Sequence, residues 1–266
     1  MTPLTGYVQG VGLVGPGLPS WAQGAARLAG AAPWEWAATV MPQPQCLPPA
    51  ERRRTPASVR LALGVGLEAT ANAGADAAQL AAVFSSSSGD GQNCHEICEA
   101  LATGERLISP TRFHNSVHNA AAGYWGIATG ATAAANALCA YDASFGAALL
   151  EALTQVRTEG VPVLLVAYDT VHPEPLWRVR GLPEAFGVAL VLAPEAGAAP
   201  RARLAVGFSE APATPMSEPR LEALRAGVPA ARSLPLLARL ARGGDARVVL
   251  EYLKPPQLAV EVSACP

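Results

Sequence analysis

The sequence has few charges and few aromatic residues for its length. Of 266 residues, 15% are charged and 6% are aromatic, the net charge is −2, and there is one lysine, Lys254. The only basic run, Arg52–Arg54, is typical of a solvated helix, so we predict no nucleic-acid partner. Half of the residues are hydrophobic and the mean hydropathy is +0.22. We therefore expect another chain to cover part of the surface.

Long apolar runs are also missing. The strongest ones, residues 161–167 and 188–193, are far shorter than the ~20 residues that a membrane span needs. The first residues, MTPLTGYVQG, have neither the basic nor the apolar region of a signal peptide. These absences predict a cytoplasmic protein without a membrane span.

The five cysteines are odd in number and follow no disulfide framework, so reduced thiols are expected. Cys94 and Cys98 lie four residues apart and flank His95, but no second pair of ligands occurs at a matching spacing. We therefore predict neither a metal site nor a cofactor.

Apolar periodicity predicts strands that alternate with helices. The expected strands are 7–14, 80–85, 163–168, 188–192 and 202–208, and the expected helices are 21–29, 55–73, 94–101, 115–128 and 145–158. This alternation favours an α/β fold with a buried, mostly parallel sheet and helices on both faces.

The pattern changes after residue 210, where proline and alanine become dense before a leucine-rich helix at 233–240. Two closing strands are expected at 248–253 and 258–262. We interpret residues 1–210 as the main domain and residues 211–266 as a short C-terminal extension that packs on the same domain.

Two glycine-rich segments resemble nucleotide-binding motifs. Gly10–Gly15 matches GxGxxG, but Pro16, Gly17 and Pro19 prevent the immediate helix start that holds a pyrophosphate. Ser85–Gly91 lacks the GK[ST] ending of a phosphate-binding loop. We interpret the second segment as a tight turn after a buried strand.

The histidines allow several interpretations. His114 and His118 lie four residues apart on an expected helix, but Asn115 stands where the HExxH motif needs glutamate. They can be metal ligands, core or cap residues, or residues that face a partner or a pocket. His172 lies in a proline-rich loop and is expected to have a surface or packing role.

Three candidate nucleophiles surround the start of the helix at 145–158. Asp142–Gly146 resembles the GxSxG elbow with its first glycine replaced, which argues against Ser144. Cys139 falls inside the expected strand, where a thiol is usually inert packing. Asp142 is either a carboxylate nucleophile or base, or a structural cap stabilised by the helix dipole.

The same region resembles the β-ketoacyl synthases, enzymes of the thiolase-like fold. Their segment N-x-x-A-G-x-x-x-I-x-x-G is matched by Asn119, Ala122, Gly123, Ile127 and Gly130. Counting on without gaps places the nucleophilic cysteine of the family at Asp142. The resemblance covers about residues 5–210 and implies a layered αβα fold. The chain would then be an N-terminal ketoacyl-synthase half with an abbreviated C-terminal portion.

Two departures from the family bear on function. The nucleophile position holds Asp142, and no histidine follows His172, although the second half of the family's fold carries two catalytic histidine motifs. Without thiolate and imidazoles, the acyl-enzyme and decarboxylation steps have no agents. We expect no catalytic residue, and no enzyme activity of the chain on its own.

Residues 113–125, FHNSVHNAAAGYW, closely resemble the chain-length-factor-like subunit of bacterial aryl polyene clusters. That resemblance implies a heterodimer with a full-length β-ketoacyl synthase and a transient contact with acyl carrier protein. Bulky side chains of this segment would line the partner interface or limit the length of the acyl tunnel. The candidates are Phe113, His114, His118, Asn119, Tyr124 and Trp125.

Other functions remain open at this point. The chain could be an active acyltransferase or condensing enzyme of unusual mechanism that uses Asp142, or a hydrolase based on Ser144. A homodimer is a further alternative, because the central helix and strand of this fold are self-complementary.

Overall fold

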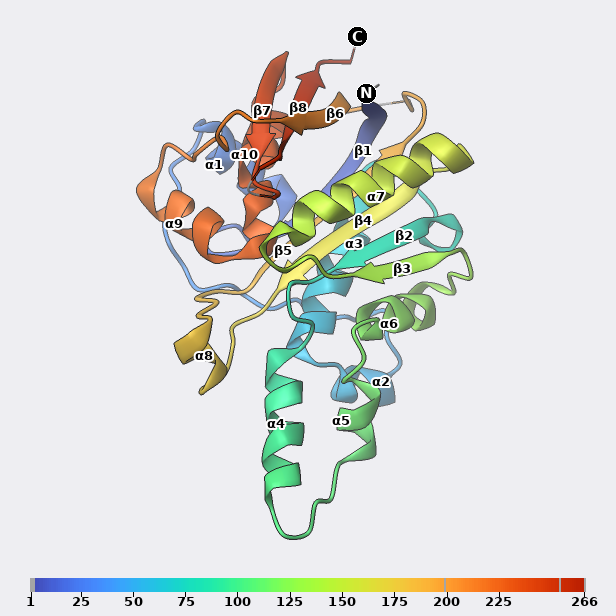
Figure 1. Ribbon diagram of the computed structural model, residues 1–266. Coiled ribbons are helices and arrows are strands. Elements are labelled where there is room, and N and C mark those ends of the chain that lie inside the picture. The colour runs from blue at the N-terminus through green and yellow to red at the C-terminus, as the bar shows by residue number, and fades with distance from the viewer. Residues whose placement is uncertain (1–2, 199, 254, 266) are drawn as a thin grey trace.

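A computed structural model describes residues 3–198, 200–253 and 255–265. Its described strands form one eight-stranded sheet with the order β3-β2-β4-β5-β1-β6-β8-β7 (Figure 1). The strands are β1 (Leu4–Val14), β2 (Ala81–Ser85), β3 (Ala135–Leu138), β4 (Val163–Asp169), β5 (Phe186–Ala193), β6 (Ala202–Ser209), β7 (Ala246–Leu250) and β8 (Gln257–Ser263).

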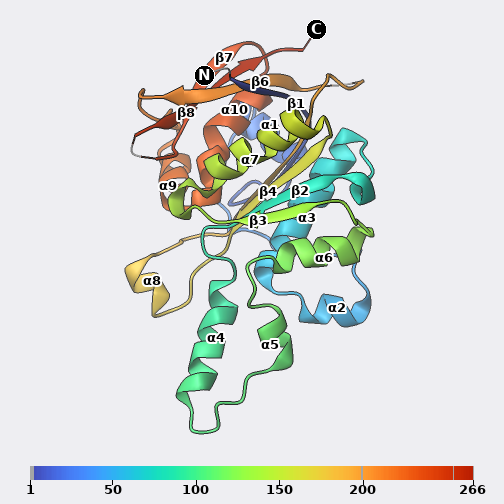
Figure 2. The ribbon, with the colours of Figure 1, turned by 45° about the vertical axis from the view of Figure 1, so that its right-hand side comes forward.

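Helices cover both faces of the sheet (Figure 2). One face carries α3 and α6, and the other carries α7, α10 and the short helix η3. The helices are α1 (Trp21–Ala29), α2 (Pro49–Arg54), α3 (Ala57–Ala73), α4 (Gly91–Ala102), α5 (Pro110–His114), α6 (Ala120–Thr129), α7 (Ser144–Glu159), α8 (Leu176–Val179), α9 (Pro219–Gly227) and α10 (Leu234–Arg242), with the 3-10 helices η1 (Ala77–Gln79), η2 (Tyr141–Ala143) and η3 (Pro229–Ser233). Across the described ranges, every helix is too short or too polar to span a bilayer.

The prediction of a mostly parallel sheet is wrong. Among the described strands, β2 pairs in parallel with β3 and β4, while the other five pairings are antiparallel. A parallel return needs a crossover, usually a helix, across the face of the sheet. α7 supplies such a crossover between β3 and β4, but α8 stays at the edge of the sheet and β5 returns antiparallel to β4 (Figure 1).

Helix α3 lies directly against β1, and two glycines of β1 permit this contact. A Cβ atom on Gly10 would lie 2.0 Å from the carbonyl oxygen of Ala69, and one on Gly12 would lie 1.9 Å from that of Val65. Any side chain at these positions would force α3 away from the sheet. Gly10 and Gly12, which match the GxGxxG pattern, therefore allow α3 to pack closely on β1.

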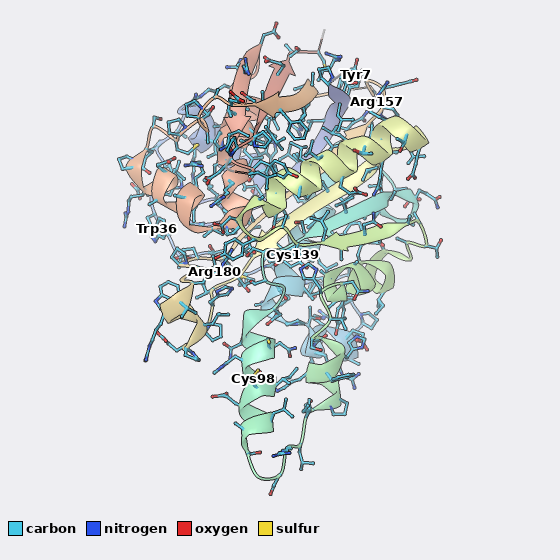
Figure 3. All side chains as sticks on the ribbon, in the orientation of Figure 1. Tyr7, Trp36, Cys98, Cys139, Arg157 and Arg180 are labelled. Carbon is cyan, nitrogen blue, oxygen red and sulfur yellow. The ribbon has the colours of Figure 1, made fainter. Side chains whose placement is uncertain are left out.

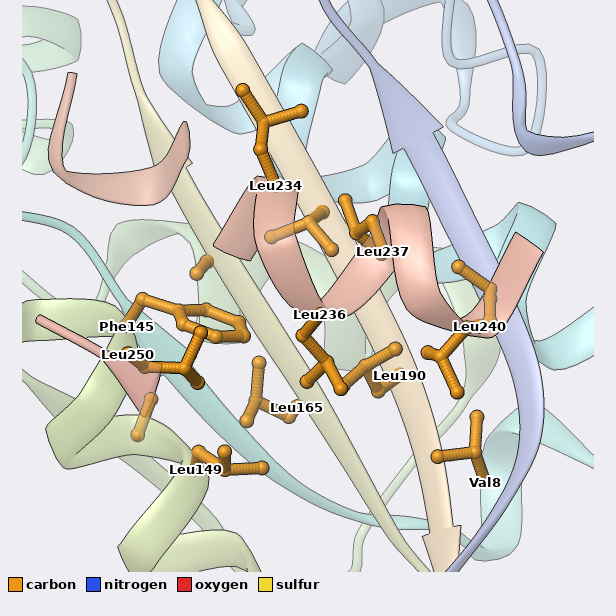
Figure 4. Close-up of a cluster of buried hydrophobic side chains, with 14 of the residues drawn as sticks. Val8, Phe145, Leu149, Leu165, Leu190, Leu234, Leu236, Leu237, Leu240 and Leu250 are labelled. Carbon is orange, nitrogen blue, oxygen red and sulfur yellow. The ribbon is translucent and has the colours of Figure 1, made fainter. Parts of the chain in front are cut away.

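The C-terminal residues complete the opposite side of the core. Strands β7 and β8 extend the same sheet beyond β6. Helix α10 turns Leu234, Leu236 and Leu237 toward the sheet, where Leu236 lies near Leu165 and Leu190 (Figure 4). Residues after 210 thus share one core with the preceding ones, and the boundary at 210 stays a prediction.

Helices α4 and α5 form an arm that projects from one edge of the sheet (Figures 1 and 2). The helix predicted over 115–128 begins only at Ala120, because α5 ends at His114 and the chain turns there. The buried Asn115 fixes that turn by donating from Nδ2 to the carbonyl oxygen of Arg54 at 3.0 Å. His114 and His118 consequently do not share a helix.

Candidate functional site

The candidate site lies where the parallel strands β2, β3 and β4 end. The carboxyl ends of parallel strands meet at one edge of a sheet, and the loops that follow them come together there. Here these loops are 86–90, 139–143 and 170–175. Figure 3 shows Cys139 and Arg180 at this edge, from which α4 and α8 extend.

The turn before α7 is held by the side chain of Ser144, the first residue of the helix. Tyr141 has a φ of 53°, in the left-handed region that few side chains adopt. Ser144 is 2% exposed; its Oγ donates to the carbonyl oxygen of Tyr141 at 2.6 Å and accepts from the backbone N–H of Ala140 at 3.1 Å. The Ser144 hydroxyl is committed to the turn, so the geometry does not support a Ser144-based hydrolase.

Asp142 is held between two arginines. Its Oδ1 accepts from Arg180 at 2.8 Å, and its Oδ2 lies 3.2 Å from a terminal nitrogen of Arg232. The guanidinium of Arg180 also stacks on the ring of Tyr141, 3.5 Å from its centroid. Both oxygens of the carboxylate are therefore engaged by guanidinium groups.

The ion pairs continue into the C-terminal residues. Arg232, whose side chain is 7% exposed, also contacts Glu251 at 3.2 Å. Glu251 lies 3.3 Å from Arg225, which in turn pairs with Glu222 at 2.7 Å. The hydrogen bond from Arg225 lowers the pKa of Glu222. We call Asp142, Arg180, Arg232, Glu251, Arg225 and Glu222 the ion-pair chain.

A second carboxylate, Asp169, is fully buried beside the turn. Its Oδ1 accepts from the backbone N–H of Ser87 at 2.9 Å, and its Oδ2 accepts from the backbone N–H of Ala230 at 2.8 Å. Burial raises the pKa of Asp169, although these hydrogen bonds act in the opposite direction. Asp169 is the last residue of β4, and its carboxylate connects the loop after β2 with η3 through these two hydrogen bonds.

His172 is buried rather than on the surface. It is 4% exposed, with Nε2 2.8 Å from the Oγ of Ser88 and Nδ1 2.8 Å from the carbonyl oxygen of Arg180. The proline-rich loop thus carries a histidine that joins the loop after β2 to the segment after α8.

The expectation for Cys139 is wrong. β3 ends at Leu138, and Cys139 lies beyond the strand with an exposed side chain. Its thiol contacts the carbonyl oxygen of Ser87 at 3.2 Å. The strand is shorter than the pattern indicated because the chain turns at Ala140 to reach η2.

Residues 113–125 divide between surface and core. Phe113 is 69% exposed, and His114 and Asn119 are also exposed. His118 is half-buried and donates from Nε2 to the carbonyl oxygen of Ser86 at 3.2 Å. The side chains of Phe113, His114 and Asn119 are therefore accessible to a partner chain, and that of His118 is partly accessible.

Tyr124 and Trp125 are both 1% exposed and belong to the core between α3, α6 and β2. The ring of Trp125 lies 6.2 Å from that of Phe84, and Tyr124 packs edge-on against His114 at 5.9 Å. Burial raises the pKa of Tyr124. Both side chains are core residues in this structure, and their role at the tunnel or the partner interface stays a prediction.

A cavity of about 850 Å³ lies beside the site, between α2, α3, α4 and α5. Arg60, Asn93 and His172 are among the residues that line it. In the described part of the chain, no group of three His, Cys, Asp or Glu side chains is arranged to hold a metal ion.

The family described as "Beta-ketoacyl synthase, N-terminal domain" matches residues 21–249. The chain belongs to this family. Its fold is the thiolase-like α/β fold. A search of curated proteins finds no match.

Solved structures give the same fold. A chain of the complex of a ketosynthase (ApeO) with its chain length factor (ApeC) from Xenorhabdus doucetiae is 25% identical, with a TM-score of 0.73 and coverage of 97% of this chain and 99% of that one. The ishigamide ketosynthase/chain length factor is 17% identical (TM-score 0.73; 98% and 100% covered). The AntDE:AntF complex of a type II polyketide acyl carrier protein with its ketosynthase is 12% identical (TM-score 0.76; 100% of both chains covered).

Spacing to the family motif identified Asp142 as a site residue, but the sequence analysis missed Arg180, Arg232 and Glu251. Arginine and glutamate in segments distant from residue 142 carry no motif. The serine-rich loop after β2 was interpreted as a tight turn, so Ser88 was not singled out, and nothing in the sequence linked that loop to His172.

Proposed function

We propose that this chain is a non-catalytic chain-length-factor subunit that pairs with a full-length β-ketoacyl synthase and shapes its acyl tunnel. The observation that carries the proposal is the Asp142 carboxylate, held by Arg180 and Arg232 at the start of α7. By the spacing of the β-ketoacyl synthase motif, this position corresponds to the nucleophilic cysteine of the family. A carboxylate that already bonds two guanidinium groups is a poor substitute for a thiolate.

The edge of the sheet offers a surface for the partner. β3 is the first strand in the sheet order, so its outer side has no strand partner among the described strands. Ala135 and Asn136 in β3 are exposed, and Ile127 of α6 is 50% exposed nearby in sequence. An unpaired strand edge beside apolar side chains is suited to association with another chain. The partner that we propose for this edge is a ketosynthase. The similarity of this chain to a chain of the ApeO–ApeC complex supports that choice.

The proposed product class is an aryl polyene, built on a carrier protein that contacts the pair transiently. The resemblance of residues 113–125 to aryl polyene subunits supports this assignment. A conjugated acyl chain is flat and packs well on aromatic faces. Phe113, exposed on the arm, is the aromatic side chain of this segment that is placed to meet such a chain.

Replacing Asp142 by asparagine tests the non-catalytic role. We expect the variant to co-purify 1:1 with the full-length ketosynthase from the same genome, and the pair to condense malonyl units within about twofold of the wild-type rate. The measurements are light scattering for stoichiometry and chromatography of the polyene product. As a positive control for loss of condensation activity, the nucleophilic cysteine of the ketosynthase itself is replaced by alanine.

Two outcomes would reject this proposal. A rate loss of about 100-fold or more in an intact pair carrying Asp142→Asn would assign the chemistry to Asp142, as in the acyltransferase alternative. A stable homodimer that takes up no ketosynthase would reject the partner role.

Replacing Phe113 by alanine is expected to shift the product distribution toward longer chains, by about one extension unit, because a bulky side chain no longer limits the tunnel. Mass spectrometry of the released polyenes measures the shift. Phe208→Ala is the matched control: Phe208 is a half-exposed phenylalanine on β6, at a distance from β3 in the sheet order. Unchanged lengths with Phe113→Ala would remove Phe113 from the tunnel.

A further inference from the structure

The contact between His172 and the carbonyl oxygen of Arg180 fixes the tautomer of the neutral imidazole. A backbone carbonyl oxygen only accepts hydrogen bonds, so Nδ1, which lies 2.8 Å from that of Arg180, carries a proton. In the neutral ring, Nε2 then presents its lone pair to the Ser88 hydroxyl at 2.8 Å. The Ser88 hydroxyl donates to an imidazole that is ready to take its proton.

Exposure favours a chemical role over a simple packing contact. His172 is 4% exposed, so its orientation is fixed by the surrounding chain, whereas Ser88 is exposed and open to a substrate. An accessible nucleophile, a base in hydrogen-bond reach and a third group that orients the base form the arrangement that activates serine hydroxyls. Ser88, His172 and the carbonyl of Arg180 have these three positions.

The loop around Ser88 is held on both sides. Ser86 Oγ accepts from the backbone N–H of Gly89 at 2.9 Å, and Asp169 accepts from that of Ser87. The ring of His172 packs against the start of α4, because a Cβ on Gly91 would lie 3.1 Å from its Cδ2. The Ser88 hydroxyl and the His172 ring are therefore pre-positioned relative to each other.

We propose that Ser88 accepts acyl groups from thioesters, with His172 as its general base. Ser88 Oγ attacks the thioester carbonyl carbon as its proton passes to Nε2 of His172. The carbon–sulfur bond then breaks, and the leaving sulfur takes the proton from Nε2. The products are a Ser88 ester and a free thiol. The step needs neither a thiolate at position 142 nor decarboxylation. It is therefore separate from the condensation chemistry that the proposed function assigns to the ketosynthase partner, and it goes beyond the role as partner subunit.

The first turn of α4 supplies hydrogen-bond donors near this loop. The first N–H groups of a helix have no acceptor within the helix. The side chain of Asp90 accepts from the N–H of Asn93 at 2.8 Å, and the N–H groups of Gly91 and Gln92 precede it in the same turn. A developing oxyanion on a Ser88-bound carbonyl would be stabilised by donors of this kind.

The test is covalent labelling of the full-length chain, alone or in complex with its ketosynthase, with a fluorophosphonate and separately with an octanoyl N-acetylcysteamine thioester. We expect one adduct on this chain, which peptide mapping locates at Ser88. Ser88→Ala should remove it, and His172→Gln should slow its formation at least about tenfold, as loss of a general base does. Ser217→Ala, at an exposed serine before α9, should leave labelling unchanged.

A structural contact would behave differently. If Ser88→Ala leaves the adduct in place, or if folded His172→Gln labels as fast as the wild type, the proposal is wrong. Should His172→Gln fail to fold, Ser88→Ala still decides whether the acyl group is placed at Ser88. An adduct that persists in folded Ser88→Ala would overturn the assignment. None of these outcomes bears on pairing with a ketosynthase.

Discussion

Replacing Trp125 by alanine is expected to lower the free energy of unfolding by ~3–5 kcal/mol, the usual cost of emptying a large aromatic site in a core. Trp125 is 1% exposed, and its ring packs against Phe84 and the backbone of Gly66, where a Cβ would lie 2.9 Å from Cζ3 of the indole. Truncation would leave a cavity between α3, α6 and β2. Urea unfolding followed by circular dichroism measures the loss.

Phe113→Ala is the matched control, since Phe113 lies twelve residues earlier in the same segment and is exposed. Its effect on unfolding should stay within about 0.5 kcal/mol. If Trp125→Ala instead left stability unchanged and altered only product length, Trp125 would line a tunnel and its place in the core would be wrong.

Replacing Asp169 by asparagine is expected to destabilise the chain by ~2–3 kcal/mol, the cost of leaving a buried backbone N–H without an acceptor. One amide oxygen can still accept from Ser87, but the amide nitrogen would then face the N–H of Ala230, which is also a donor. Thermal or urea unfolding measures the loss. A variant as stable as the wild type would mean that water or a shift of η3 replaces the lost acceptor.

The effect of Asp169→Asn should also depend on pH. Burial raises the pKa of Asp169 in the folded chain, so the folded state binds its proton more tightly than the unfolded state does. The contribution of this group is therefore present below the unfolded pKa and is lost as the pH rises through the folded pKa. The stability difference between wild type and variant should shrink from about pH 4 upward. A difference that grows with pH would contradict the direction of the shift.

Local sequence signals predicted most elements of the fold. The helix at 21–29 was predicted with its observed bounds, because Ser20 caps its first turn and Gly30 ends it in the left-handed region. The sheet direction was predicted wrongly, because apolar strands buried on both faces look alike whether they run parallel or antiparallel. Pairing is decided by distant segments, such as β1 between β5 and β6.

The site was predictable only where a motif exists. Spacing identified Asp142, but the arginines that bind it come from the loop after α8 and from η3. The aromatic enrichment of residues 113–125 indicated a functional segment, but it did not indicate which of its side chains are buried. Tyr124 and Trp125 turned out to fill the core because α6 packs that side on α3 and β2.

The ion-pair chain restricts which side chains residue 142 can tolerate. Its charges alternate in sign, and Arg232 and Arg225 are largely buried, so a mutation that deletes one acid leaves a buried cation undercompensated. Replacing Asp142 by cysteine would therefore not be neutral on its own, because Arg232 would lose one of its two carboxylate partners. Further substitutions along the ion-pair chain would have to accompany such a change.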